Sequence, residues 1–217
     1  MNKTYLVTAG PTHEKIDPVR YIGNYSSGKM GFAVAERLAS LGAKVILVVG
    51  PVALQCKNEN IVRIDVVSAT EMHTQCLNHF GDCNGAIMVA AVADFTPVIV
   101  DNQKIKRTSG NYLLELRPNP DIAASLGKIK RNDQVLVGFA LETNDEEQNA
   151  LAKLQKKNLD FIVLNSLRDS GSGFQHDTNR IKILDRSGAI STYDLKSKTE
   201  VAVDIVNKMI EIEDSIL

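Results

Sequence analysis

The chain has 217 residues, of which 44% are hydrophobic and 24% are charged, and this composition predicts a globular protein built as one large domain. Its formal net charge of −1 gives no reason to expect binding to nucleic acid or to anionic membranes, which needs an accumulated cationic field. The three cysteines, Cys56, Cys76 and Cys83, form no C-x-x-C pair, so metal or thiol catalysis has little support and a reducing compartment is favoured.

The first part of the chain alternates short β-branched apolar segments with helical patterns. It begins without a targeting pattern, and no apolar stretch reaches about 18 residues, so we expect a cytoplasmic protein without membrane contact. A strand at 4–8, a helix at 30–41 and a strand at 44–49 form a βαβ unit. Further strands are predicted at 61–67, 86–92, 134–139 and 161–164, with helices at 69–78, 121–129 and 145–158.

These strands carry few polar residues on either face, which is typical of a parallel sheet covered by helices. We therefore predict an α/β fold with a Rossmann-like, doubly wound, mainly parallel sheet and helices on both faces. Toward the C-terminus, segments 180–184 and 189–195 flank a turn at Asp185-Arg-Ser-Gly188 and predict a hairpin before a final helix. The chain shows no repeats or linkers, so residues 1–217 are expected to form a single domain.

The segment Gly23-Asn-Tyr-Ser-Ser-Gly-Lys-Met-Gly31 resembles most of a phosphate-binding P-loop. The P-loop motif requires Ser or Thr after its lysine, whereas Met30 follows Lys29 here. Gly23 also lies thirteen positions after Gly10, where the first strand is expected to end, so a Walker A loop is disfavoured. A dinucleotide-binding turn is disfavoured too, because the second glycine and the acidic residue after the second strand are both missing.

Physical chemistry still favours an anion site in this segment. Ser26-Ser-Gly28 before a helix places hydroxyls, backbone N–H groups and the positive end of a helix dipole together, with Lys29 beside them. The structural alternative is that Ser27 is only an N-cap and Gly28 only a loop glycine.

Seven motifs, in order between about Thr4 and Ile183, resemble those of the phosphopantothenoylcysteine synthetase family, also called phosphopantothenate–cysteine ligase. They are Thr8-Ala-Gly-Pro-Thr12, Ile16-Asp-Pro-Val-Arg-Tyr-Ile22, Asn24-Tyr-Ser-Ser-Gly-Lys-Met-Gly31, Ala90-Ala-Val-Ala-Asp94, Lys104-Ile-Lys-Arg107, Asn119-Pro-Asp121 and Gly138-Phe-Ala-Leu-Glu-Thr143. The resemblance implies coenzyme A biosynthesis. In this reaction 4′-phosphopantothenate is activated by CTP with Mg²⁺, and the acyl cytidylate is then converted by cysteine to 4′-phosphopantothenoylcysteine, CMP and pyrophosphate.

The resemblance also implies roles for individual residues. Asn24 would donate to the acyl carbonyl as cysteine attacks, and Lys104 would neutralise the triphosphate. Lys153 and Lys157 stand four apart on one predicted helix and could hold one polyphosphate. The implied nucleotide contacts are Gly10, Ser26, Ser27, Gly28, Lys29, Ala90, Ala91, Asp94, Lys104, Pro120, Asp121, Ile122, Ala123, Phe139, Lys153 and Lys157. Each of these residues taken alone is equally typical of a solvated charge, a turn or core packing, and metal ligands stay unassigned.

In the family, the segment corresponding to about 93–117 forms a flap that crosses to a second subunit. Here it contains apolar strands expected at 96–100 and 112–116, and an isolated hairpin of this kind is marginally stable in water. A homodimer is therefore expected. Bacterial members are commonly fused to a flavin-dependent decarboxylase, so this sequence resembles the ligase half, and a separate chain could supply the decarboxylase.

Several alternatives stay open. An NAD(P)-dependent oxidoreductase of Rossmann type would share the fold and would bind NAD(P)H tightly, and a non-catalytic nucleotide-binding regulator would release no pyrophosphate. Gly23 and Tyr25 stand where many family members have Ser and His, and the choice between CTP and ATP is open. The segment at 169–179 is similar to the family's G-F-x-x-D-x-N pattern, and neither Asn165 nor Asp177, the aspartate of that pattern, receives a role.

Overall fold

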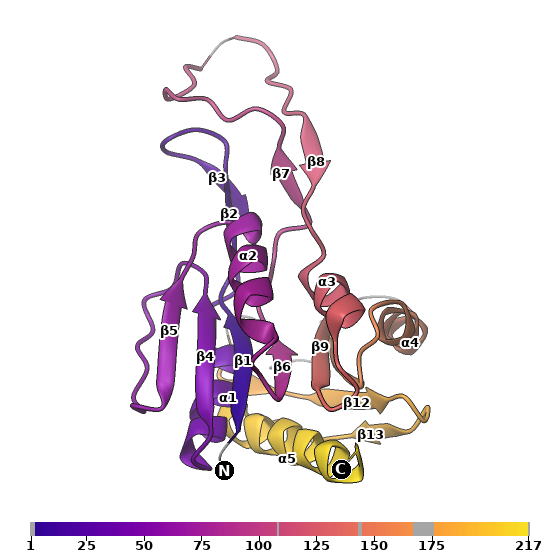
Figure 1. The fold of residues 1–217 in the computed structure, drawn as a ribbon. Coiled ribbons are helices and arrows are strands. Elements are labelled where there is room, and N and C mark those ends of the chain that lie inside the picture. Colours follow the sequence, from indigo (N-terminus) through magenta and orange to yellow (C-terminus); the bar gives the residue numbers. More distant parts are fainter. Residues whose placement is uncertain (1–2, 108, 143–144, 167–175, 217) are drawn as a thin grey trace.

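A computed structural model describes residues 3–107, 109–142, 145–166 and 176–216 (Figure 1). Its centre is an eight-stranded sheet in the order β13-β12-β10-β9-β6-β1-β4-β5. The strands are β1 (Thr4–Ala9), β4 (Lys44–Val49), β5 (Ile61–Asp65), β6 (Gly85–Met88), β9 (Val135–Glu142), β10 (Phe161–Ser166), β12 (Ile181–Asp185) and β13 (Ile190–Thr192). All neighbours pair in parallel except β10 with β12 and β12 with β13, so the predicted mainly parallel sheet and the C-terminal hairpin are confirmed.

Helices cover both faces of the sheet, as predicted. Helices α1 (Lys29–Ser40) and α5 (Lys198–Ile216) pack on one face, and α2 (Ala69–Phe80), α3 (Ile122–Ile129) and α4 (Glu146–Lys156) pack on the other. Strand β1 shows why both faces are apolar: Tyr5 and Val7 belong to the core under α1 and α5, whereas Leu6 belongs to the core under α2. The sheet is buried between two hydrophobic layers.

The chain order reverses beside β1. After β1 it continues to β4 and β5 on one side, and it then crosses back through α2 to β6 on the other side. Doubly wound sheets bind ligands at the carboxyl ends of the strands where the order reverses. The segments that leave β1 and β6 meet there, since the Ala91 N–H donates to the Gly10 carbonyl oxygen at 2.9 Å and the Ala90 N–H donates to Thr8 Oγ1 at 3.1 Å.

Within the body of the molecule, one strand is shorter than the sequence predicted and one hairpin was not predicted. The strand expected at 86–92 ends at Met88, because the residues after it bend toward the segment that follows β1, where Pro11 and Ala91 form an isolated bridge. A hairpin of β2 (His13–Lys15) and β3 (Tyr21–Gly23) was not predicted. Its turn is closed by a side chain, since Asp17 Oδ1 accepts from the N–H groups of Val19 and Arg20 at 2.8 Å each.

The flap at 93–117 rises from the end of the molecule where the parallel strands terminate, above the β2–β3 hairpin (Figure 1). Among the described residues of the flap, β7 (Phe95–Pro97) pairs with β8 (Leu116–Pro118), so the strands expected at 96–100 and 112–116 are shorter and displaced. A long loop connects them, and within the described residues it is tied to the β2–β3 turn. Asp17 Oδ2 accepts from the Ile105 N–H at 3.1 Å, and Arg20 Nη2 donates to the Ile105 carbonyl oxygen at 3.0 Å.

Two further short strands, β11 (Thr178–Asn179) and β14 (Lys196–Ser197), pair with each other just before α5 begins. Across the described parts of the chain, no helix combines the length and the apolar character needed to cross a membrane.

Candidate active site

A cavity of about 550 Å³ lies at the carboxyl ends of β1, β6, β9 and β10. Its walls include the N-terminal ends of α1 and α3, the inner side of α4 and the first residue of α5. This volume is within the usual range for a small-molecule or cofactor site, and the position is the one where the strand order reverses. The cavity is therefore the candidate ligand site of the fold.

The N-terminal end of α1 forms the side of this cavity that is best suited to bind an anion. The N-cap is Gly28 rather than Ser27, with φ +78° and no side-chain cap, and no acidic residue lies in the first turn. Ser26 Oγ accepts from the Gly28 N–H at 3.3 Å. A Cβ atom at Gly28 would lie 3.4 Å from the Cα of Gly10, so two glycines allow the loop to cross the end of β1. The uncapped helix end favours an anion.

Asn24 lines the cavity next to this helix end. Its Nδ2 donates to the carbonyl oxygens of Ala91 at 2.9 Å and Val92 at 3.2 Å. Both amide hydrogens therefore go to backbone carbonyls, and Oδ1 is the remaining polar atom of the side chain. The predicted donation from Asn24 to an acyl oxygen requires one of these two bonds to be exchanged.

Helices α3 and α4 form the opposite wall, with Pro120, Asp121, Ile122 and Ala123 among the lining residues. Asp121 is the N-cap of α3, where its Oδ1 accepts from the Ala124 N–H at 3.0 Å. Burial acts to raise the pKa of the Asp121 carboxyl, but the Ala124 N–H and the Lys157 ammonium outweigh it and hold the pKa below its ordinary value.

Lys153 and Lys157, which the spacing of four residues predicts to share one face, both line the cavity. Each already has a carboxylate partner: Lys153 Nζ lies 2.5 Å from Glu142 Oε1, and Lys157 Nζ lies 3.0 Å from Asp121 Oδ2. A polyphosphate held by these two lysines would have to compete with Glu142 and Asp121 for their charge.

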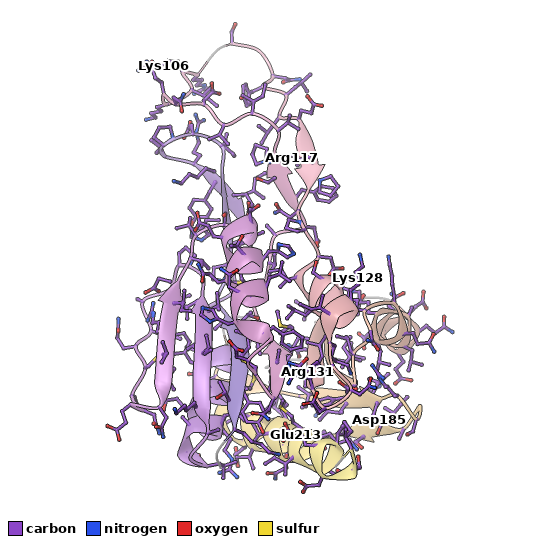
Figure 2. All side chains as sticks on the ribbon, viewed as in Figure 1. Lys106, Arg117, Lys128, Arg131, Asp185 and Glu213 are labelled. Carbon is purple, nitrogen blue, oxygen red and sulfur yellow. The ribbon has the colours of Figure 1, made fainter. Side chains whose placement is uncertain are left out.

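The remaining predicted residues divide into two groups. Ala90, Ala91, Asp94 and Phe139 line the same cavity as the α1 loop. Lys104 does not: it is exposed on the flap loop, and Figure 2 shows Lys106, two residues further on, at the outer end of the flap. The structure thus brings together every predicted site residue except Lys104. Thr143 and residues 169–174 of the family motifs lie outside the described residues.

Some polar cavity residues received no role from the sequence. Asn165 lines the cavity from β10, and its buried Oδ1 accepts no hydrogen bond from any described residue. Asn179 and Lys198 line it from β11 and from the start of α5. Nothing in the sequence indicated that Lys198 belongs to the site, because a lysine at the start of an amphipathic helix is usually a solvated charge.

Within the described ranges, no three side chains of His, Cys, Asp or Glu are grouped in a way that could hold a metal ion.

The family called DNA/pantothenate metabolism flavoprotein C-terminal domain matches residues 1–212. The chain belongs to this family. It is 56% identical over 205 residues to a cysteine/cysteine sulfinic acid decarboxylase of an unknown prokaryotic organism, covering 94% of this chain and 57% of that protein. It is 44% identical over 207 residues to the coenzyme A biosynthesis bifunctional protein CoaBC of Bacillus subtilis strain 168, covering 95% of this chain and 51% of that protein. The chain thus spans about half the length of the curated relatives it matches.

A solved structure of this flavoprotein C-terminal domain family agrees with the fold. The crystal structure of the C-terminal domain of CoaBC matches with a TM-score of 0.82 and 38% identity, covering 98% of this chain and 96% of that one. The family resemblance carried by the seven motifs and the predicted Rossmann-like fold are both confirmed.

Proposed function

We propose that the protein is a phosphopantothenate–cysteine ligase of coenzyme A biosynthesis that uses CTP. The observation that carries this proposal is the cavity at the strand reversal, where Asn24, the Ser26–Lys29 loop and the α3–α4 wall converge in a chain of this family. The 38% identity to a CoaBC C-terminal domain over nearly the whole chain supports the ligase over an oxidoreductase or a regulator.

In the first half-reaction, the carboxylate oxygen of 4′-phosphopantothenate attacks the α-phosphorus of CTP. The bond from that phosphorus to the bridging oxygen breaks, and pyrophosphate leaves with the electron pair. The uncapped N-terminal end of α1 and the Lys29 ammonium supply positive potential to the phosphates, which is the largest contribution that a protein makes to such a step.

Magnesium suits this arrangement as an ion that enters with the triphosphate. Mg²⁺ in nucleotide sites keeps several waters and is bound by phosphates and one or two carboxylates, so it needs no three-carboxylate cage. Asp94 is an exposed carboxylate on the cavity wall and would be the protein group to hold it. When bound, the ion would neutralise phosphate charge.

In the second half-reaction, the neutral amine of cysteine attacks the acyl carbonyl. The bond from the acyl carbon to the phosphate oxygen breaks, CMP leaves, and the amine nitrogen loses a proton as the amide forms. Negative charge grows on the acyl oxygen during attack, and an amide donor stabilises it. We assign this donor to Asn24, which exchanges its bond to Ala91 or Val92 for the substrate.

The flap supports a homodimer. Its exposed apolar side chains are Phe95, Val98, Ile99, Val100, Tyr112, Leu113 and Leu116. Several large apolar side chains exposed on one segment favour an interaction site, because monomeric soluble proteins rarely expose large apolar patches. Because Lys104 is exposed and outside the cavity of its own chain, we propose that the flap delivers it to the cavity of a second copy.

The test is to incubate the protein with 4′-phosphopantothenate, Mg²⁺ and each nucleoside triphosphate in turn, and to measure pyrophosphate. The expected result is release with CTP that depends on 4′-phosphopantothenate, followed by the amide product when cysteine is added. The same samples are analysed for carbon dioxide released from cysteine and cysteine sulfinate. Carbon dioxide without pyrophosphate, or no pyrophosphate with any triphosphate, would contradict the ligase.

A further inference from the structure

One wall of the cavity carries two lysines, and one of them pairs with an exposed carboxylate. Lys29, the first residue of α1, and Lys198, the first residue of α5, both line the cavity. Lys29 Nζ lies 2.5 Å from Asp177 Oδ1, and the Lys198 backbone N–H donates to the Asp177 carbonyl oxygen at 2.9 Å. Two helices from distant parts of the chain therefore present cations at one place.

Lys198 is unusual because its charge is buried. Only 7% of the Lys198 surface is exposed, and Lys198 Nζ donates to the His176 carbonyl oxygen at 2.5 Å. Burial lowers the pKa of the Lys198 ammonium, and the charge of Lys29 lowers it further. The ammonium of a surface lysine is normally solvated by water. A buried ammonium on a cavity wall, with a second positive charge beside it, is stabilised when an anionic ligand binds there.

Asp177, in contrast to the buried Lys198, is exposed to solvent. Its side chain is 83% exposed, and its bond to Lys29 holds the pKa of its carboxyl below the ordinary value. An exposed ion pair contributes little to stability, so this carboxylate can leave Lys29 at small cost. Once it leaves, two lysines face the cavity.

We propose that Lys29 and Lys198 form the subsite for the β- and γ-phosphates of the nucleoside triphosphate, and that the Asp177 carboxylate occupies Lys29 until the triphosphate displaces it. The inference rests on the proposed ligase function, because it takes the triphosphate as the ligand of this cavity. Two cations match the multiple charge of a pyrophosphoryl group better than the single charge of a carboxylate substrate. The subsite also adjoins the N-terminal end of α1, so one chain of phosphates can contact both.

A competing interpretation gives Lys198 a purely structural task. Its bond to the His176 carbonyl oxygen could simply hold the residues just before β11 against the start of α5. A structural lysine would affect every ligand of the cavity equally. A phosphate-binding lysine would affect only ligands that carry β- and γ-phosphates, so comparing CTP with CMP separates the two.

The experiment is calorimetric titration of the full chain with CTP and with CMP, each in the presence of Mg²⁺. The variants are Lys198→Met, Lys29→Met and Asp177→Asn. The matched control is Lys196→Met, because Lys196 lies two residues from Lys198, pairs with Asp204 at 2.9 Å and does not line the cavity. Circular dichroism and the melting temperature of each variant are recorded beside the titrations.

We expect Lys198→Met to weaken CTP binding by about tenfold to a hundredfold, the loss typical of one hydrogen bond to a charged group, and to leave CMP binding within about twofold. Lys29→Met should weaken CTP more than CMP in the same way. Asp177→Asn should tighten CTP binding by about threefold or more, because no carboxylate competes for Lys29. The control should bind both nucleotides as the parent does.

Unchanged CTP binding in Lys198→Met, or an equal loss for CTP and CMP, would overturn the subsite. If Lys198→Met does not fold, Asp177→Asn decides: weaker or unchanged CTP binding in that variant would overturn the displacement of Asp177 by the triphosphate. A parent protein that binds CTP but shows no effect of these changes removes the subsite and leaves the ligase proposal intact. A parent that binds neither nucleotide removes both.

Discussion

The cavity and the flap are built in opposite ways. The cavity is lined by short loops that leave buried strands, and its polar groups are held by bonds to backbone, such as those from Asn24 to Ala91 and Val92. The flap exposes large apolar side chains, with Leu113 at 90% and Ile99 at 73% exposure. The flap loop is held to its own chain by the β2–β3 turn, through the bond from the Ile105 N–H to Asp17.

Under the proposed dimer, this difference separates the steps that one chain can perform from those that require a second copy. The sheet positions the cavity residues whether or not the protein associates, because their anchors are core strands. Lys104 has no such anchor in its own cavity. Changes in the cavity should therefore impair the reaction at every protein concentration, whereas changes on the flap should have effects that depend on concentration.

The largest effect is expected from Asn24→Asp, a change inside the cavity. A carboxylate cannot donate to the acyl oxygen and repels the charge that develops there, so amide formation should fall by a factor on the order of 10³ while pyrophosphate is still released. Acyl nucleotide should accumulate and be detected by mass spectrometry after rapid quenching with cysteine present. Amide formation at the parental rate, or an equal loss of both half-reactions with the fold intact, would show that Asn24 lacks this role.

Lys104→Gln tests the flap contribution to the first half-reaction. Loss of one preorganised charge should slow acyl-nucleotide formation by a factor on the order of 10², with a smaller effect on the cysteine step. The readout is pyrophosphate release in a single turnover. Lys106→Gln is the matched control, since Lys106 lies on the same loop at the outer end of the flap (Figure 2). Rates within tenfold of the parent would remove Lys104 from the site.

A double change of Ile99 and Val100 to Asp tests whether the flap is the interface. Two unpaired charges in an apolar contact should weaken the dimer by several kcal/mol, which sedimentation velocity detects as a shift toward monomer. Activity should then rise with protein concentration. The control is Ile190→Asp, because Ile190 is 44% exposed on the edge strand β13, away from the flap. A double variant that stays dimeric and active would show that the interface lies elsewhere.

The smallest effect is expected where the flap loop meets the β2–β3 turn, from Asp17→Asn. The Arg20 guanidinium, together with the N–H groups of Val19, Ile105 and Arg20, outweighs the effect of burial and holds the pKa of the Asp17 carboxyl well below its usual range. Because the pKa of Asp17 is lower in the folded state, its carboxylate stabilises the folded form at pH values above the unfolded-state pKa of about 3.9. This stabilisation is lost as the pH falls below that pKa toward the folded-state value.

Limited proteolysis of the flap from pH 7 to pH 3.5 with an acid-active protease measures this contribution. The flap of Asp17→Asn should be cut several-fold faster than that of the parent at pH 7, and the difference should shrink toward pH 3.5. Asp101→Asn is the control, because the Asp101 contact to the β2–β3 turn is made by its backbone N–H. A difference between parent and Asp17→Asn that grows in acid would contradict the role of the Asp17 carboxylate.

Local patterns in the sequence determined the elements and the family. Apolar segments such as 4–8 and 44–49 predict buried parallel strands because the covering helices leave no face for polar residues. The Ser26–Lys29 segment predicts an anion site because hydroxyls, a glycine and a helix start are adjacent in sequence. Both signals lie within a few residues of chain, so no tertiary information is needed to read them.

Only the tertiary structure decided which charges meet. Lys29 pairs with Asp177, 148 residues away, and Lys153 and Lys157 have carboxylate partners on β9 and at the start of α3. Lys198 enters the cavity because the β11–β14 pair brings the start of α5 to the strand ends. Hydrophobic periodicity reports which face of an element is buried, but charge pairing depends on distances across the folded chain. The cationic subsite and the separation of Lys104 from its own cavity were therefore visible only in the fold.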